Sequence, residues 1–180
     1  MNRTTWTYVF ITYLVTWSIT LISYSFYKVG TLSLDQLNLI YNFGALGPLL
    51  GALICSWVFY GNKGVKTLFF TFSFTKLNKQ SLYISLSPLL FFVVGLLVFP
   101  LFSGHWYTFA DTQKQYSLTN QISYVSWLLP FITYSIFEEF GWRGFLLPHL
   151  QSKYTAFKST IILTIIWAAW CFVSNQSVLI

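Results

Sequence analysis

Five long stretches without a charged side chain divide the sequence, and they constrain the fold more than any other feature. They cover residues 6–27, 41–60, 81–102, 122–137 and 159–180. About 20 apolar residues are what an α-helix needs to cross the hydrocarbon core of a bilayer. The stretches are continuously apolar and lack the short alternation of a transmembrane β-barrel. We therefore predict an all-α fold, a polytopic transmembrane helical bundle of about five spans.

The composition supports an integral membrane protein. Of the 180 residues, 56% are hydrophobic and only 8% are charged, too few to solvate a soluble domain of this size. The formal net charge is +6, but the basic residues lie between the predicted spans. We therefore expect membrane lipid as a partner and no nucleic acid. No composition shift or repeat marks a second domain, so residues 1–180 are predicted to form a single membrane-embedded domain.

The distribution of positive charge predicts the orientation. Cytoplasmic loops of membrane proteins carry an excess of Lys and Arg. With the N-terminus in the cytoplasm, eight of the ten basic residues fall on the cytoplasmic side, all except Lys28 and Lys114. We predict this orientation. It makes residues 61–80 a cytoplasmic connection, with the apolar segment 68–74 lying in the membrane interface.

Small residues open the second span. Gly44, Gly47, Pro48 and Gly51 follow one another at short spacing. In lipid, small residues allow two helices to approach closely. We predict that this face packs against another helix and does not bind a ligand.

Two adjacent glutamates end the fourth apolar stretch. Glu138 and Glu139 are the only glutamates in the sequence, and carboxylates in or at a membrane span are costly and usually functional. Arg143 follows Glu139 by four residues, so the two share one helix face in the order that favours an ion pair. Glu138 lies about 100° around the helix and is left out of that pair. The spacing predicts one neutralised carboxylate and one free carboxylate.

The stretch around these glutamates resembles a known family. Residues 138–150 read Glu-Glu-Phe-Gly-Trp-Arg-Gly-Phe-Leu-Leu-Pro-His-Leu. This is similar to the first motif, EExxxR, of the CAAX prenyl protease and bacteriocin-processing (CPBP, Abi) family of intramembrane metalloproteases. The resemblance is strongest over residues 126–173. It implies that Glu138 activates water as general base, that Glu139 is its partner, and that Arg143 braces the helix.

The family's second motif places a histidine after a Trp-x-x-Trp frame on the next span. Here the frame is Trp167-Ala-Ala-Trp170, and Cys171 stands where the histidine is expected. The resemblance implies a Zn²⁺ cofactor, for which Cys171 is the candidate metal ligand. A later motif of the family would lie on a further helix, which the sequence does not contain before Ile180. The C-terminal helices of the family are therefore expected to be missing.

The resemblance implies a metal-dependent endopeptidase that cleaves peptide or protein substrates. Its implied location is the membrane, in particular a bacterial plasma membrane. The alternative is a catalytically inactive or truncated homologue that acts as a membrane protein for bacteriocin immunity or as a scaffold. A transporter fragment in which Glu138 relays protons is a further alternative. The Glu139–Arg143 spacing and the Trp-x-x-Trp frame argue against that last possibility.

Overall fold

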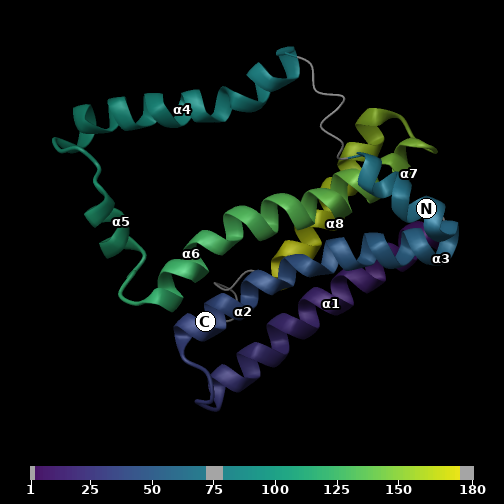
Figure 1. Ribbon diagram of the computed structural model, residues 1–180, viewed down its shortest axis with the longest axis horizontal. Helices are drawn as coiled ribbons and strands as arrows, with labels where there is room; N and C mark the ends of the chain where they lie inside the picture. The colour runs from purple at the N-terminus through teal and green to yellow at the C-terminus, as the bar shows by residue number, and fades with distance from the viewer. Residues whose placement is uncertain (1–2, 72–78, 175–180) are drawn as a thin grey trace. The chain divides into compact units, whose positions relative to one another are not determined.

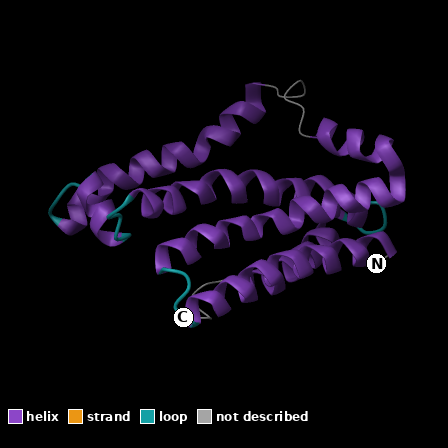
Figure 2. Cartoon of the chain, turned by 60° about the horizontal axis from the view of Figure 1, so that its bottom comes forward, coloured by secondary structure: helices purple, strands orange, loops and turns teal. Residues whose placement is uncertain are grey.

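The computed structural model describes residues 3–71 and 79–174, and within these ranges it contains helices and connecting turns but no strand (Figure 2). The predicted all-α class is confirmed. The helices, in chain order, are α1 (Arg3–Lys28), α2 (Leu34–Tyr41), the 3₁₀ turn η1 (Asn42–Ala45), α3 (Leu46–Thr71), α4 (Lys79–Ser103), α5 (Phe109–Gln115), α6 (Gln121–Thr133), the π-helical segments η3 (Tyr134–Glu138) and η4 (Phe140–Leu146), α7 (Leu147–Gln151) and α8 (Ala156–Ser174).

Several of these helices are long and apolar enough to cross a membrane. Among the described residues they are Arg3–Lys28, Leu34–Thr71 and Leu86–Ser103, and Ala156–Phe172 is a shorter apolar helix. The predicted stretch 122–137 runs through α6 into η3 without a break in the helical path. The helical membrane class is thus confirmed. The count of about five spans and the cytoplasmic N-terminus stay predictions.

The chain divides into two compact units, Met1–Phe72 with Asn120–Ile180, and Ser73–Thr119. The single membrane-embedded domain stays a prediction. The second unit holds α4 and α5. No residue of the α4 segment 86–103 is buried, which suits an apolar helix that lipid surrounds.

Helix α5 begins with a capping box outside the predicted spans. The carboxylate of Asp111 accepts hydrogen bonds from the backbone N–H and the side-chain O–H of Thr108, each at 2.7 Å. These bonds stabilise the ionised form, so they hold the pKa of Asp111 below its usual value. The first turn of α5 therefore depends on an ionised carboxylate.

Helices α1 and α3 of the first unit lie side by side (Figure 1). Two glycines of α3 make this possible. A Cβ atom at Gly47 would lie 2.6 Å from the carbonyl oxygen of Thr12, and one at Gly51 would lie 2.5 Å from the hydroxyl of Thr12. Atoms do not approach so closely, so only glycine fits at either position. The predicted packing face of the second span is confirmed, and α1 is its partner.

The face of α1 that meets α3 is lined with small hydroxyl side chains. Thr16 donates a hydrogen bond to the carbonyl oxygen of Gly44 in η1, at 2.7 Å. Ser23 instead donates to the carbonyl oxygen of Ile19 in its own helix, at 2.6 Å. Hydroxyls that bond to backbone carbonyls can be buried without a large desolvation cost. The buried Ser and Thr residues of α1 are Thr4, Thr5, Thr12, Thr16, Thr20 and Ser23.

Helix α3 extends further than the sequence predicts. Its path changes at Gly61, whose φ of 61° and ψ of −158° lie outside the helical region. Glycine adopts this backbone at little cost, and the helix resumes and runs on to Thr71. Residues 62–71, predicted to be part of an interfacial connection, are therefore helical. The rest of the predicted interfacial segment, 72–74, lies outside the described residues.

Candidate functional site

The two glutamates lie at the junction of two π-helical segments. Glu138 is the last residue of η3, Glu139 links the segments, and η4 begins at Phe140. A π-helix bonds i to i+5 and is wider than an α-helix, and short π segments inside helices occur frequently at functional sites. The apolar pattern of the sequence predicted a helix here but gave no sign of its changed winding.

The ion pair between Glu139 and Arg143 forms as the spacing predicted. Its side chains are accessible, with exposed fractions of 32% for Glu139 and 55% for Arg143. The Arg143 guanidinium also lies 5.7 Å from the ring centre of Trp167, within the range of a cation–π interaction. Arg143 therefore connects η4 to α8 as well as neutralising Glu139.

Glu138 takes no part in that ion pair and is buried, with 6% of its surface exposed. The indole groups of Trp167 and Trp142 lie close enough to act on its carboxylate as hydrogen-bond donors. The Trp142 Nε1 atom nevertheless does not reach full hydrogen-bonding geometry. Tyr134 and Cys171 also lie within electrostatic range of Glu138. The free carboxylate is thus enclosed by aromatic rings and one thiol.

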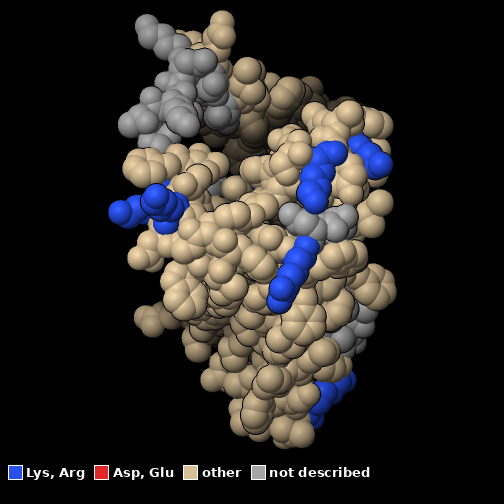
Figure 3. All heavy atoms as spheres, turned by 90° about the vertical axis from the view of Figure 1, so that its right-hand side faces the viewer, with Lys and Arg blue, Asp and Glu red and all other residues tan. Residues whose placement is uncertain are grey.

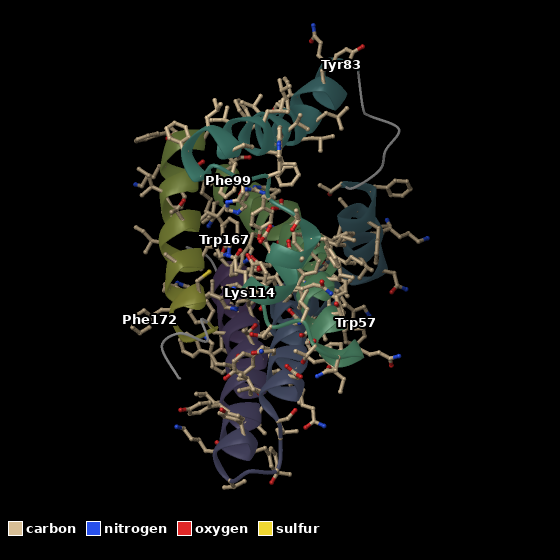
Figure 4. All side chains as sticks on the ribbon, turned by 90° about the vertical axis from the view of Figure 1, so that its left-hand side faces the viewer. Trp57, Tyr83, Phe99, Lys114, Trp167 and Phe172 are labelled. Carbon is tan, nitrogen blue, oxygen red and sulfur yellow. The ribbon has the colours of Figure 1, made fainter. Side chains whose placement is uncertain are left out.

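An aromatic cluster joins the two sequence motifs. Trp142, which is 1% exposed, packs edge-to-face on Trp170 with ring centres 5.6 Å apart and stacks on Trp167 at 6.3 Å. In Figure 4, Trp167 points from α8 toward the neighbouring helices, whereas Phe172 points away from them. The structure therefore brings the predicted Trp-x-x-Trp frame against the predicted glutamate motif.

Tyr8 of α1 lies beneath the motif, and no sequence motif pointed to it. It is fully buried, and its ring packs edge-to-face on Trp142 at 5.7 Å. Its hydroxyl lies close to the Thr12 side chain and within electrostatic range of Glu138. Gly141 leaves the space for it, because a Cβ atom at that position would lie 2.5 Å from the Tyr8 hydroxyl oxygen. No local sequence pattern could link positions so far apart in the chain.

Two hydrogen bonds hold α8 beside α1 and so position Cys171. Tyr13 donates from its hydroxyl to the carbonyl oxygen of Ile166. Trp17 donates from Nε1 to the carbonyl oxygen of Trp170, at 3.3 Å. Cys171 itself is exposed. The predicted metal ligand Cys171 thus lies within electrostatic range of the Glu138 carboxylate.

The described residues do not fit the zinc ion that the resemblance implies. Catalytic zinc sites use three protein ligands and an open position. In residues 3–71 and 79–174 no three His, Cys, Asp or Glu side chains come together. Near Glu138 only Cys171 adds a donor of the right kind, since Glu139 binds Arg143. His149 binds the Phe145 carbonyl oxygen and the Tyr60 hydroxyl instead.

The fold and the site define an integral membrane protein with a buried carboxylate, and two comparisons relate it to known proteins. Residues 120–180 match the family model described as type II CAAX prenyl endopeptidase Rce1-like. A segment of 36 residues is 50% identical to CAAX prenyl protease 2 of the archaeon Methanococcus maripaludis. The resemblance to the CAAX-protease family is thereby confirmed for the C-terminal third of the chain.

These matches cover limited parts of the proteins. The aligned segment spans 20% of this chain and 13% of the Methanococcus maripaludis protease. No solved structure matches the chain significantly. The matched residues 120–180 include η3, η4 and α8, the elements that carry Glu138, Arg143 and Cys171.

Proposed function

We propose that the chain is a membrane-embedded endopeptidase of the CAAX-protease type, with Glu138 as general base. One observation carries this proposal. Glu138 is buried and forms no ion pair within the described part of the chain, where Arg143 binds Glu139 instead. A carboxylate kept free in an apolar environment is costly to a fold, and such groups are usually retained for proton transfer.

The chemistry follows from a single free carboxylate. Glu138 accepts a proton from a water molecule while the water oxygen attacks the carbonyl carbon of the scissile peptide bond. It then gives this proton to the nitrogen of the leaving amine as the C–N bond breaks. Glu138 ends the cycle ionised, and the peptide has gained one water molecule.

The aromatic cluster orients the base. Trp167 presents its indole N–H group toward the Glu138 carboxylate, and an indole can only donate a hydrogen bond. Such donors favour an ionised carboxylate and limit its rotation, while the rings exclude bulk water. Glu139 and Arg143 act as positioning residues, since their ion pair and the stacking of Arg143 near Trp167 fix η4 against α8.

The proposal includes zinc at this site only if further ligand atoms complete its coordination. A bound zinc ion would polarise the scissile carbonyl and activate water, but Glu138 and Cys171 supply two donors at most. Zinc content of the detergent-purified protein tests this directly, without reference to activity. Stoichiometric zinc that is lost in Cys171→Ala and retained in Cys171→His would make Cys171 a ligand. Absence of zinc from the native protein and from both variants would remove the metal from the mechanism.

The proposed substrate is a peptide or protein that ends in a prenylated CAAX sequence, as the descriptions of the similar proteins suggest. The test is release of the last three residues from a farnesylated CAAX peptide by the purified full chain in lipid nanodiscs. Glu138→Gln removes the base and keeps the shape of the side chain. General-base catalysis contributes about 10²- to 10⁴-fold, so we expect the rate to fall by that factor.

The matched control is Asp35→Asn, an acid-to-amide change at a carboxylate that binds Asn120 away from the cluster. We expect its cleavage rate to stay within about twofold of the native rate. Both variants must have the circular dichroism spectrum of the native chain. An unchanged rate in Glu138→Gln would remove Glu138 as the base.

The alternative is an inactive homologue that serves as a membrane immunity or scaffold protein. The two-donor site favours it, because Cys171 replaces the expected histidine and the described residues supply no third ligand. This alternative predicts no cleavage by the native chain, together with protection from a bacteriocin that Glu138→Gln leaves intact. A plasma-membrane location is part of both proposals, and membrane fractionation tests it.

A further inference from the structure

A pocket of about 610 Å³ lies in the first unit, apart from the aromatic cluster around Glu138. It opens between the part of α3 near and beyond Gly61 and the segment formed by the end of η4 and α7. Its size lies within the range of pockets that bind small ligands, roughly 300–1,000 Å³. The sequence motifs did not point to it, and neither proposed activity uses it.

The polar groups of the pocket are a lysine, a histidine and several hydroxyls. His149 is held by two contacts, from Nδ1 to the Phe145 carbonyl oxygen at 2.6 Å and from Nε2 to the Tyr60 hydroxyl at 3.1 Å. A carbonyl oxygen only accepts, so Nδ1 carries a proton and donates it to Phe145. Lys63 also lines the pocket and forms no salt bridge among the described residues.

None of the acidic side chains is left to neutralise Lys63. The sequence contains four acidic residues, and each is engaged elsewhere. Glu138 lies in the aromatic cluster, Glu139 binds Arg143, Asp35 accepts from Asn120 at 2.6 Å, and Asp111 caps α5. No acidic side chain therefore pairs with Lys63, which leaves its ammonium group available to an anion from outside the described residues.

Other basic residues lie close in the sequence to the residues that line the pocket. Figure 3 shows Lys and Arg on the face of the molecule where α7 and the end of α3 lie in Figure 1, and no Asp or Glu is visible on that face. Lys66 follows Lys63 in α3, and Lys153 lies just after α7. Such a face attracts the phosphates of anionic lipids.

The remaining walls of the pocket are apolar, formed in part by Leu68, Phe145 and Pro148. The pocket also lies where the predicted span 41–60 ends, the level at which lipid headgroups meet water. A cation and hydroxyls beside apolar walls fit a ligand that is charged at one end and apolar at the other. We propose that this pocket binds the phosphate group of an anionic phospholipid, with Lys63 as its cationic contact.

Titration of the purified full chain in neutral detergent with dihexanoylphosphatidic acid tests the proposal, with Trp fluorescence as the readout. A hydrogen bond to a charged group contributes about 1.5–3 kcal/mol, so Lys63→Gln should weaken binding about tenfold or more. Lys63→Arg should retain most of the affinity. The matched control is Lys66→Gln, an exposed lysine of the same helix that does not line the pocket. We expect it to bind within about twofold of the native chain.

Two further probes identify the source of the phosphate. Inorganic phosphate that binds as tightly, with the same loss in Lys63→Gln, would support a phosphate site whose ligand is the free ion. Much weaker binding of inorganic phosphate would support the lipid. Equal losses in Lys63→Gln and Lys66→Gln would overturn the proposal, because they indicate general surface attraction. Decanoate binding as tightly as dihexanoylphosphatidic acid would also overturn it, since any anionic amphiphile would then suffice.

Discussion

Replacement of Gly141 by alanine tests the contact between α3 and the glutamate motif. The added Cβ atom would lie 2.6 Å from the carbonyl oxygen of Pro48 and 2.5 Å from the hydroxyl oxygen of Tyr8. Pro48 and Tyr8 are both less than 2% exposed, so neither has free space into which to move. Overpacking a tight interior costs about 1–3 kcal/mol. Alanine is intrinsically more stable than glycine in a helix by about 1 kcal/mol, which offsets part of that cost.

Gly95→Ala supplies the reference for this comparison. Gly95 lies exposed in α4, and a Cβ atom there would meet nothing within 4 Å. The Gly95→Ala variant should therefore be more stable than the native chain by about 1 kcal/mol, the helical preference of alanine over glycine, without any steric cost. We expect Gly141→Ala to be less stable than Gly95→Ala by about 1–3 kcal/mol, the overpacking cost alone.

The assay is reversible unfolding by sodium dodecyl sulfate in mixed micelles, followed by the fluorescence of the eight tryptophans. Trp142 is adjacent to Gly141 and reports the local change. If the two variants have the same free energy of unfolding, then η4 does not pack on Pro48 as tightly as described. The close approach would then be no constraint on the glutamate motif.

Two further predictions concern other parts of the chain. Tyr13→Phe removes the hydrogen bond to the Ile166 carbonyl oxygen and should lower the free energy of unfolding by about 0.5–1.5 kcal/mol. An unchanged free energy of unfolding in the same micelle assay would show that this bond does not join α1 to α8. Hydrogen bonds from Thr108 lower the pKa of Asp111 in the folded protein. The stabilisation of α5 by this carboxylate should therefore be complete at a pH above the unfolded pKa of about 3.9. It should disappear as the pH falls through the lower pKa of the folded protein. Carbon NMR of the Asp111 carboxyl group should show a titration midpoint below that of an unfolded peptide, and an equal midpoint would contradict the capping box.

Local patterns in the sequence were enough for the helical class and for short-range pairs. The Glu139–Arg143 ion pair follows from a spacing of four residues, and the charge-free stretches locate most of the long helices. The close-packing role of Gly47 and Gly51 also followed from residue size. Their partner on α1 did not, because it depends on contacts between residues more than 30 positions apart.

Features that depend on long-range contacts were missed for the same reason. Tyr8 lies under Gly141, 133 positions further along the chain, and nothing near either residue indicates the other. The π-helical winding of η3 and η4 has no composition signal, since their residues suit an α-helix equally well. The sequence predicts a connection beyond Gly61, because its lysines are typical of a loop between spans. The pocket that this part of α3 lines could therefore not be predicted either.

The hydroxyl-lined face of α1 bears on how the protein is assembled during synthesis. Helix α1 leaves the ribosome before α3, so it enters the bilayer without the helix that later covers its threonines. Until then, Thr16 can bond only within its own helix, as Ser23 still does in the folded protein. Arrival of η1 and α3 gives the Thr16 hydroxyl a new acceptor, the Gly44 carbonyl oxygen. Pairing of these two helices is then an exchange of one hydrogen bond for another inside the lipid, which makes α1 and α3 a natural first step in insertion.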